Sequence, residues 1–133
     1  MDLIKITPDK EKAKSILNMI SLLEERIKTQ DRKRMAALII ADYYEIAKEL
    51  ITAILLLDGY KTLSHKDLID YLKENYPDCS SHEISILDSL RVLRNRIAYE
   101  GFLIEDSYLA RNELLLKSII KKLNGFVENK LNL

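Results

Sequence analysis

The fold is decided by residues 31–59, which have the sequence DRKRMAALIIADYYEIAKELITAILLLDG. Two apolar stripes follow this segment at helical spacing, and they consist of Ile39, Tyr43, Ile46, Leu50, Ala53 and Leu57, and of Ile40, Tyr44, Ala47, Ile51 and Leu55. A helix that is apolar on most sides packs at the centre of a bundle. We therefore expect a central helix that starts with Asp31 as its N-cap, runs to Asp58 and is ended by Gly59.

The remaining narrow face of this central helix is acidic. It carries Asp42, Glu45 and Glu49 at spacings that place the three carboxylates on one side. Such a row could bind a cation or receive the arginines of a partner. We favour the simpler interpretation that it is solvated or paired internally.

Four further helices are predicted around the central one. The first begins at Thr7, with Pro8 in the first helical position, and ends near Gln30. The others run from Ser64 to the residue before Tyr76, from Ser80 or Ser81 to about Tyr99, and from about Asp106 to Asn124 or beyond. Capping boxes (Ser64-x-x-Asp67 and Ser80-x-x-Glu83) and the terminators Pro77 and Gly101 mark their ends. No segment has strand periodicity, so we predict one all-α domain over residues 1–133, an up-and-down bundle of four to five helices.

Composition excludes several classes of protein. Hydrophobic residues make up 47% and charged residues 32% of the 133, a mixture that disfavours disorder. The 21 basic and 21 acidic residues give a formal net charge of +0, so the molecule as a whole is not expected to attract nucleic acid or anionic membranes. The single Cys79 cannot form an intrachain disulfide, and neither the N-terminus nor the apolar run Ile51–Leu57 resembles a signal peptide or a membrane span. We expect a cytoplasmic protein without membrane contact.

The fourth predicted helix carries the most suggestive polar residues. One face presents Asp88, Arg91, Asn95 and Tyr99, while Arg94 lies at its boundary and Arg96 on the opposite flank. The planar fork of arginine suits bidentate contact with phosphate or carboxylate. The alternative is that these arginines form ordinary ion pairs with the acidic groups Asp42, Glu45, Glu49 and Asp88.

Segment 94–99, Arg-Asn-Arg-Ile-Ala-Tyr, resembles the R-x4-6-H motif of the HEPN superfamily (higher eukaryotes and prokaryotes nucleotide-binding). A tyrosine-rich central helix at Tyr43-Tyr44, a glycine turn at Gly59 and the helix start Ser64-His65 extend the resemblance over most of the chain. It implies a homodimeric helical bundle. In active members the arginine steadies a phosphate and the histidine activates the ribose 2′-hydroxyl for RNA cleavage without a metal. Many members are toxins of toxin–antitoxin pairs encoded beside a minimal nucleotidyltransferase, and others only bind.

This sequence has Tyr99 where the motif has histidine. A tyrosine is a poor general base at neutral pH because almost none of it is ionised. We therefore expect binding of RNA or nucleotide phosphate by Arg91, Arg94, Asn95 and Arg96, with Arg94 and Tyr99 as the candidate catalytic pair of a ribonuclease whose catalysis is altered or lost. The alternative function is a non-catalytic interaction module that partners a nucleotidyltransferase.

Other chemistry finds little support in the sequence. His65 and His82 each follow a capping serine and are predicted to have structural roles. Neither occurs in a Glu-x-x-His motif, and Cys79 has no partner at zinc-ligand spacing, so we expect no metal and no cofactor. A helix-turn-helix around residues 64–76 is disfavoured by the lack of a basic recognition helix.

Overall fold

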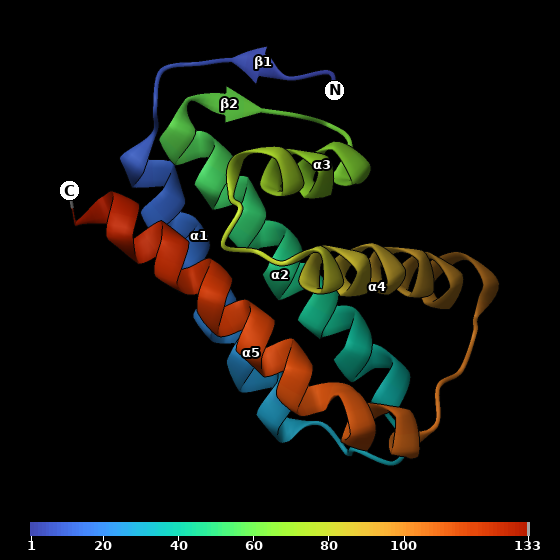
Figure 1. The fold of residues 1–133 in the computed structure, drawn as a ribbon. Coiled ribbons are helices and arrows are strands. Elements are labelled where there is room, and N and C mark those ends of the chain that lie inside the picture. Colours follow the sequence, from blue (N-terminus) through green and yellow to red (C-terminus); the bar gives the residue numbers. More distant parts are fainter. Residues whose placement is uncertain (133) are drawn as a thin grey trace.

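The computed structural model describes residues 1–132, and these form a helical bundle (Figure 1). In chain order its elements are β1 (Ile4–Lys5), α1 (Lys10–Thr29), α2 (Ala36–Asp58), β2 (Tyr60–Lys61), α3 (His65–Asn75), α4 (Ser81–Glu100) and α5 (Asp106–Leu131). The predicted all-α bundle is thereby confirmed. Among the helices of residues 1–132, none is both long enough and apolar enough to cross a membrane.

Helix α2 is the centre of the bundle, as its two apolar stripes predict. It packs against each of the other four helices, and Ile39, Leu50 and Ile54 on it are fully buried. Figure 1 shows α1, α2 and α5 running along one common direction, while α3 and α4 lie across α2. Tyr43 and Tyr44 are both 3% exposed, which confirms that they belong to the core.

The prediction that the central helix starts at Asp31 is wrong. Instead, Asp31 organises a turn, in which its Oδ1 accepts hydrogen bonds from the backbone N–H of Lys33 at 3.0 Å and of Arg34 at 3.3 Å. An aspartate favours such a turn because its short side chain reaches the backbone two or three residues ahead. Helix α2 therefore begins only at Ala36.

The N-terminal segment also differs from expectation. Helix α1 starts at Lys10 rather than at Thr7, because the side chain of Asp9 caps it by accepting from Lys12 N–H at 3.0 Å. The residues before it stay extended, since β1 pairs antiparallel with β2 and Ile6 N–H donates to the Gly59 carbonyl at 2.9 Å. A ladder of two residues per strand is too short to produce a period-two pattern, so the sequence contained no sign of it.

Most predicted helix ends are confirmed. Gly59 ends α2 with φ of +91° and Gly101 ends α4 with φ of +64°, both in the left-handed region that favours glycine. The Ser80–Glu83 capping box is fully formed at the start of α4. Helix α5 continues beyond Asn124 to Leu131.

A buried carboxylate ties three parts of the bundle together. Asp58, the last residue of α2, has a side chain only 11% exposed and accepts hydrogen bonds on Oδ2 from the hydroxyls of Tyr71 at 2.6 Å and Tyr76 at 2.7 Å. Its Oδ1 forms an ion pair with Lys130 of α5. This network holds α3 and the end of α5 against the end of α2.

Candidate functional site

The predicted site lies on the half of α4 that leaves the core. The buried residues of α4 are Ile84, Leu87 and Leu90, all in its first half, whereas Leu93 and Ile97 are only partly buried. Beyond them the helix runs out toward the 101–105 connection (Figure 1). Segment 94–99 is therefore carried on a rigid helix that is anchored at one end and exposed at the other.

Arg91 and Arg94 differ in their partners. Arg91 forms an ion pair with Asp88, one turn earlier, with Nη2–Oδ1 at 3.0 Å, and its side chain is 20% exposed. Arg94 is half-buried, and its Nη1 donates to Asn95 Oδ1 at 3.4 Å. Within residues 1–132 Arg94 has no ion-pair partner, so its charge is available to a ligand.

Arg96 and Tyr99 are not brought into this group. Arg96 forms an ion pair with Glu100 at 3.5 Å, and its guanidinium lies over the ring of Phe102, 3.9 Å from the centroid. Tyr99 is 79% exposed. The structure thus brings together Arg91, Arg94 and Asn95, while Tyr99 stands apart in solvent.

A histidine from another helix lies against α4, because His65 of α3 and Leu87 of α4 line the same small pocket, one turn before Arg91. His65, in the first turn of α3, lies against Tyr44 with ring centroids 6.1 Å apart. Burial lowers the pKa of His65 below its ordinary value, and the nearby charges of Lys48, Arg94 and Arg91 lower it further against the opposing effect of Glu45. Its imidazole is consequently neutral at physiological pH, the form in which it can accept a proton.

Sequence reasoning gave His65 only a structural role. The periodicity of one helix cannot reveal a residue that arrives from another. The Ser64-His65 helix start is one of the sequence features on which the expected resemblance to HEPN proteins rests.

The acidic stripe of α2 is satisfied internally. Asp42 accepts from Arg26 at 2.7 and 3.0 Å and from Gln30 at 2.8 Å. Lys48 forms ion pairs with Glu45 and Glu49 on the same helix. The interpretation of a paired stripe is confirmed, and none of its carboxylates forms an ion pair with the arginines of α4.

A cleft of about 490 Å³ lies beside Arg94, between α1, α2 and α4. Its polar lining consists of Arg26, Arg94, Asp42, Glu45 and Glu49. Burial acts to lower the pKa of Lys48, but its two ion pairs outweigh this and raise it above its ordinary value, so Lys48 stays charged beside two of these carboxylates. The three positive charges of Arg26, Lys48 and Arg94 match the three carboxylates around the cleft. Without Arg94, the groups that it faces carry one net negative charge.

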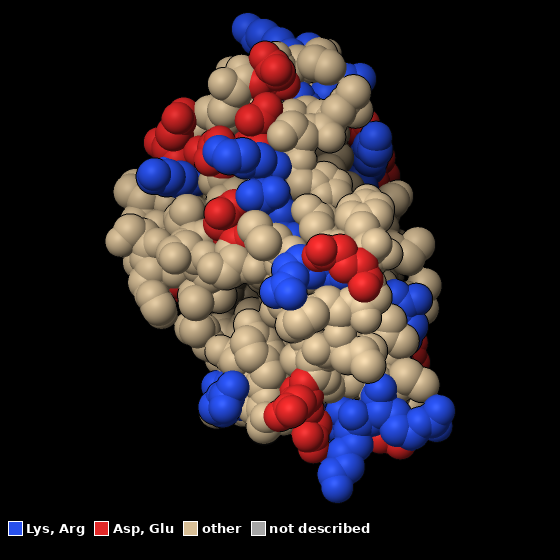
Figure 2. Space-filling model, turned by 90° about the vertical axis from the view of Figure 1, so that its right-hand side faces the viewer, with Lys and Arg blue, Asp and Glu red and all other residues tan. Residues whose placement is uncertain are grey.

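The surface around the exposed end of α4 is mixed in charge. Figure 2 shows the face toward which this end points, with positive and negative side chains interspersed and wide uncharged areas between them. Any affinity for phosphate must therefore come from individual side chains rather than from a broad positive field. Within residues 1–132 no three His, Cys, Asp or Glu side chains are grouped so that they could hold a metal ion.

Comparison with known proteins gives no match to a family model, a curated protein or a solved structure.

Proposed function

We propose that this chain is a HEPN-like protein that binds RNA or nucleotide phosphate through Arg91, Arg94 and Asn95. The observation that carries the proposal is the half-buried Arg94, which has no ion-pair partner within residues 1–132 and whose guanidinium is oriented by Asn95 at 3.4 Å. A guanidinium held in one orientation loses little entropy when it binds a phosphate through two parallel hydrogen bonds. Arg91 lies one turn earlier with its charge paired to Asp88, and its remaining N–H groups can donate to a second phosphate oxygen.

A catalytic role for His65 is supported by its place against α4, where it lines one pocket with Leu87, and by its neutral imidazole. In RNA cleavage without a metal, a base takes the proton of the ribose 2′-hydroxyl, whose oxygen then bonds to phosphorus. The bond from phosphorus to the 5′-oxygen breaks, and that oxygen takes a proton from solvent. We assign the role of base to His65 rather than to Tyr99, because burial and neighbouring cations favour its neutral form.

Binding is tested with labelled single-stranded RNA in the presence of a chelator. Loss of the charge-assisted bonds in Arg94→Ala is expected to weaken binding by about 10- to 100-fold. Arg34→Ala serves as the matched control, since Arg34 is an exposed arginine in the turn before α2 and is expected to leave binding unchanged. Equal RNA affinity in the wild-type protein and both variants would contradict the proposed site.

Catalysis is tested separately from binding. His65→Gln is expected to abolish cleavage while RNA affinity stays within about twofold, because the glutamine keeps hydrogen-bonding capacity but cannot act as a base. Tyr99→Phe is expected to leave cleavage intact. If instead Tyr99→Phe abolished cleavage and His65→Gln left it intact, Tyr99 would be the catalytic residue.

The resemblance also implies a homodimer, which we include in the proposal. The exposed part of α4 and the connection after it carry apolar side chains that a second copy could cover, namely Val92 at 47% and Leu103 at 83% exposure. Light scattering at micromolar concentration should give the mass of a dimer. A clean monomer would exclude this part of the proposal.

The second candidate function is a non-catalytic module that binds a minimal nucleotidyltransferase. It is favoured by the 79% exposure of Tyr99, because an aromatic ring held in solvent on a rigid helix is a typical anchor at protein interfaces. RNA left uncut and unbound, together with co-purification of such a partner that Tyr99→Ala abolishes, would support this function.

A further inference from the structure

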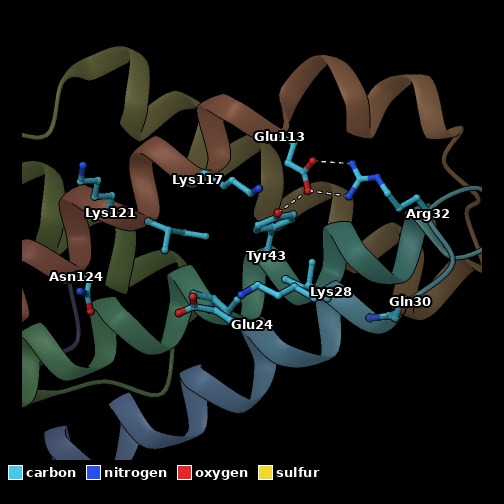
Figure 3. A pocket seen from close by; sticks show the side chains of 12 residues that line it. Glu24, Lys28, Gln30, Arg32, Tyr43, Glu113, Lys117, Lys121 and Asn124 are labelled. Atoms are coloured by element: carbon cyan, nitrogen blue, oxygen red, sulfur yellow. Dashed lines mark hydrogen bonds and ion pairs between the residues drawn. The ribbon is translucent and has the colours of Figure 1, made fainter.

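A second cavity lies where α1, α2 and α5 meet, lined by residues that the phosphate site does not use. Its volume is about 430 Å³, which is within the range of pockets that hold small organic molecules. Figure 3 shows it from close by, with side chains from all three helices around it. Its bottom is apolar, formed by Ile27, Ile46 and Ile120 together with the ring of Tyr43.

One wall is polar and fixed. Glu113 accepts two hydrogen bonds from Arg32, at 2.6 and 3.1 Å, and a third from the hydroxyl of Tyr43 at 2.6 Å (Figure 3). Because both carboxylate oxygens are engaged, Glu113 is held in place and its charge is compensated by Arg32. The hydrogen bond with Arg32, above all, holds the pKa of Glu113 below its ordinary value, so it stays ionised and paired.

The rim of the cavity has an excess of positive charge. Lys28, Lys117 and Lys121 line it, and none of the three has an ion-pair partner within residues 1–132. In Figure 3, Lys28 from α1 and Lys117 from α5 lie on opposite sides of the cavity. Once Arg32 and Glu113 are counted as a neutral pair, three lysines face one remaining carboxylate, that of Glu24, which leaves an excess of two positive charges.

We propose that this cavity binds a small amphipathic anion, with an apolar body against the isoleucines and Tyr43 and a carboxylate or phosphate between Lys28 and Lys117. An apolar bottom accounts for affinity by removing hydrophobic surface from water. Unpaired lysines at the rim select negative charge over neutral or positive analogues. This site is independent of the RNA-binding proposal, since it shares none of the residues of α4.

The test uses calorimetric titration of the full chain with 1-naphthoate and octyl phosphate, and with 1-naphthylmethanol as the uncharged analogue. Saturable binding of at least one anion is expected, about tenfold tighter than that of the alcohol. The two anions distinguish a preference for carboxylate from one for phosphate. No saturable binding of either anion, or equal affinity for the alcohol, would overturn the proposal.

Variants locate the binding. Lys117→Glu is expected to weaken binding of the anion by about tenfold or more, and Ile120→Trp to block it by filling the cavity. Lys10→Glu changes the net charge identically at an exposed site in the first turn of α1 and should have no effect. Circular dichroism verifies that each variant is folded. If Ile120→Trp does not fold, the comparison of anion affinity between Lys117→Glu and Lys10→Glu still tests the proposal. Equal anion affinity in these two variants would refute the assignment.

Discussion

Removal of the Asp58 carboxylate is predicted to be the most destabilising single change outside the apolar core. Asp58→Ala takes away the acceptor of two short hydrogen bonds, from Tyr71 at 2.6 Å and Tyr76 at 2.7 Å, and the partner of Lys130. A hydrogen bond to a charged group contributes about 1.5–3 kcal/mol, and leaving a buried donor unpaired adds its desolvation cost. Because two such hydrogen bonds are lost, we expect the free energy of unfolding, measured by urea denaturation, to fall by about 3–5 kcal/mol.

Control variants separate the network from simple loss of a side chain. Asp58→Asn keeps an acceptor for the two hydroxyls and should cost only about 1–2 kcal/mol. Tyr71→Phe should cost about 1–2 kcal/mol in the wild-type protein and close to nothing when Asp58 is already alanine, because its hydroxyl then has no partner to lose. An Asp58→Ala protein within about 1 kcal/mol of wild type, or equal costs of Tyr71→Phe in both backgrounds, would refute the reasoning.

Three further predictions follow from the geometry. Gly59→Ala should destabilise the fold by about 1–2 kcal/mol in urea unfolding, because φ is +91° and the added Cβ would lie 3.0 Å from the Ile6 carbonyl oxygen. An unchanged free energy of unfolding would show that a side chain at this position causes no strain. Proton NMR should find the pKa of His65 below its ordinary 6.5, and Arg94→Ala should raise it, since removing a positive charge favours the imidazolium. Alkaline stability depends on tyrosines whose pKa burial raises in the folded state, namely Tyr43, Tyr71 and Tyr76. Their contribution is complete below about pH 10 and is lost as the pH rises, by about 1.4 kcal/mol per pH unit for each tyrosine. A flat unfolding free energy between about pH 9 and 11 would show that these hydroxyls are not held as described.

The candidate site was predictable only in the part that one helix contributes. Helical spacing alone places Arg91 and Asn95 on one face, and the structure gives Arg94 and Asn95 a hydrogen bond at 3.4 Å. The same spacing grouped Tyr99 with them, but α4 has left the core at that point and the ring is exposed. The spacing of residues along a helix tells in which direction a side chain points, but not which other helices lie there. Helical spacing therefore could not reveal that Tyr99 is exposed.

The sequence by itself determined the helices and most of their ends. Ser80, Gly59 and Pro77 start or end a helix through residues within a few positions of themselves. Their effect depends on local backbone geometry, so it can be predicted from the sequence. Long apolar stripes likewise marked α2 as the centre, because only burial on nearly all sides satisfies such a surface.

Tertiary packing decided the rest, which consists of contacts between residues far apart in the chain. The β1–β2 ladder, the packing of His65 against α4 and the cavity behind Tyr43 each depend on how the helices cross. Crossing geometry follows from the packing of side chains across whole interfaces, and no local pattern contains it. For that reason the polar residues of α4 were visible in the sequence, whereas the packing of His65 against α4 and the basic cavity on α1, α2 and α5 became visible only in the folded chain.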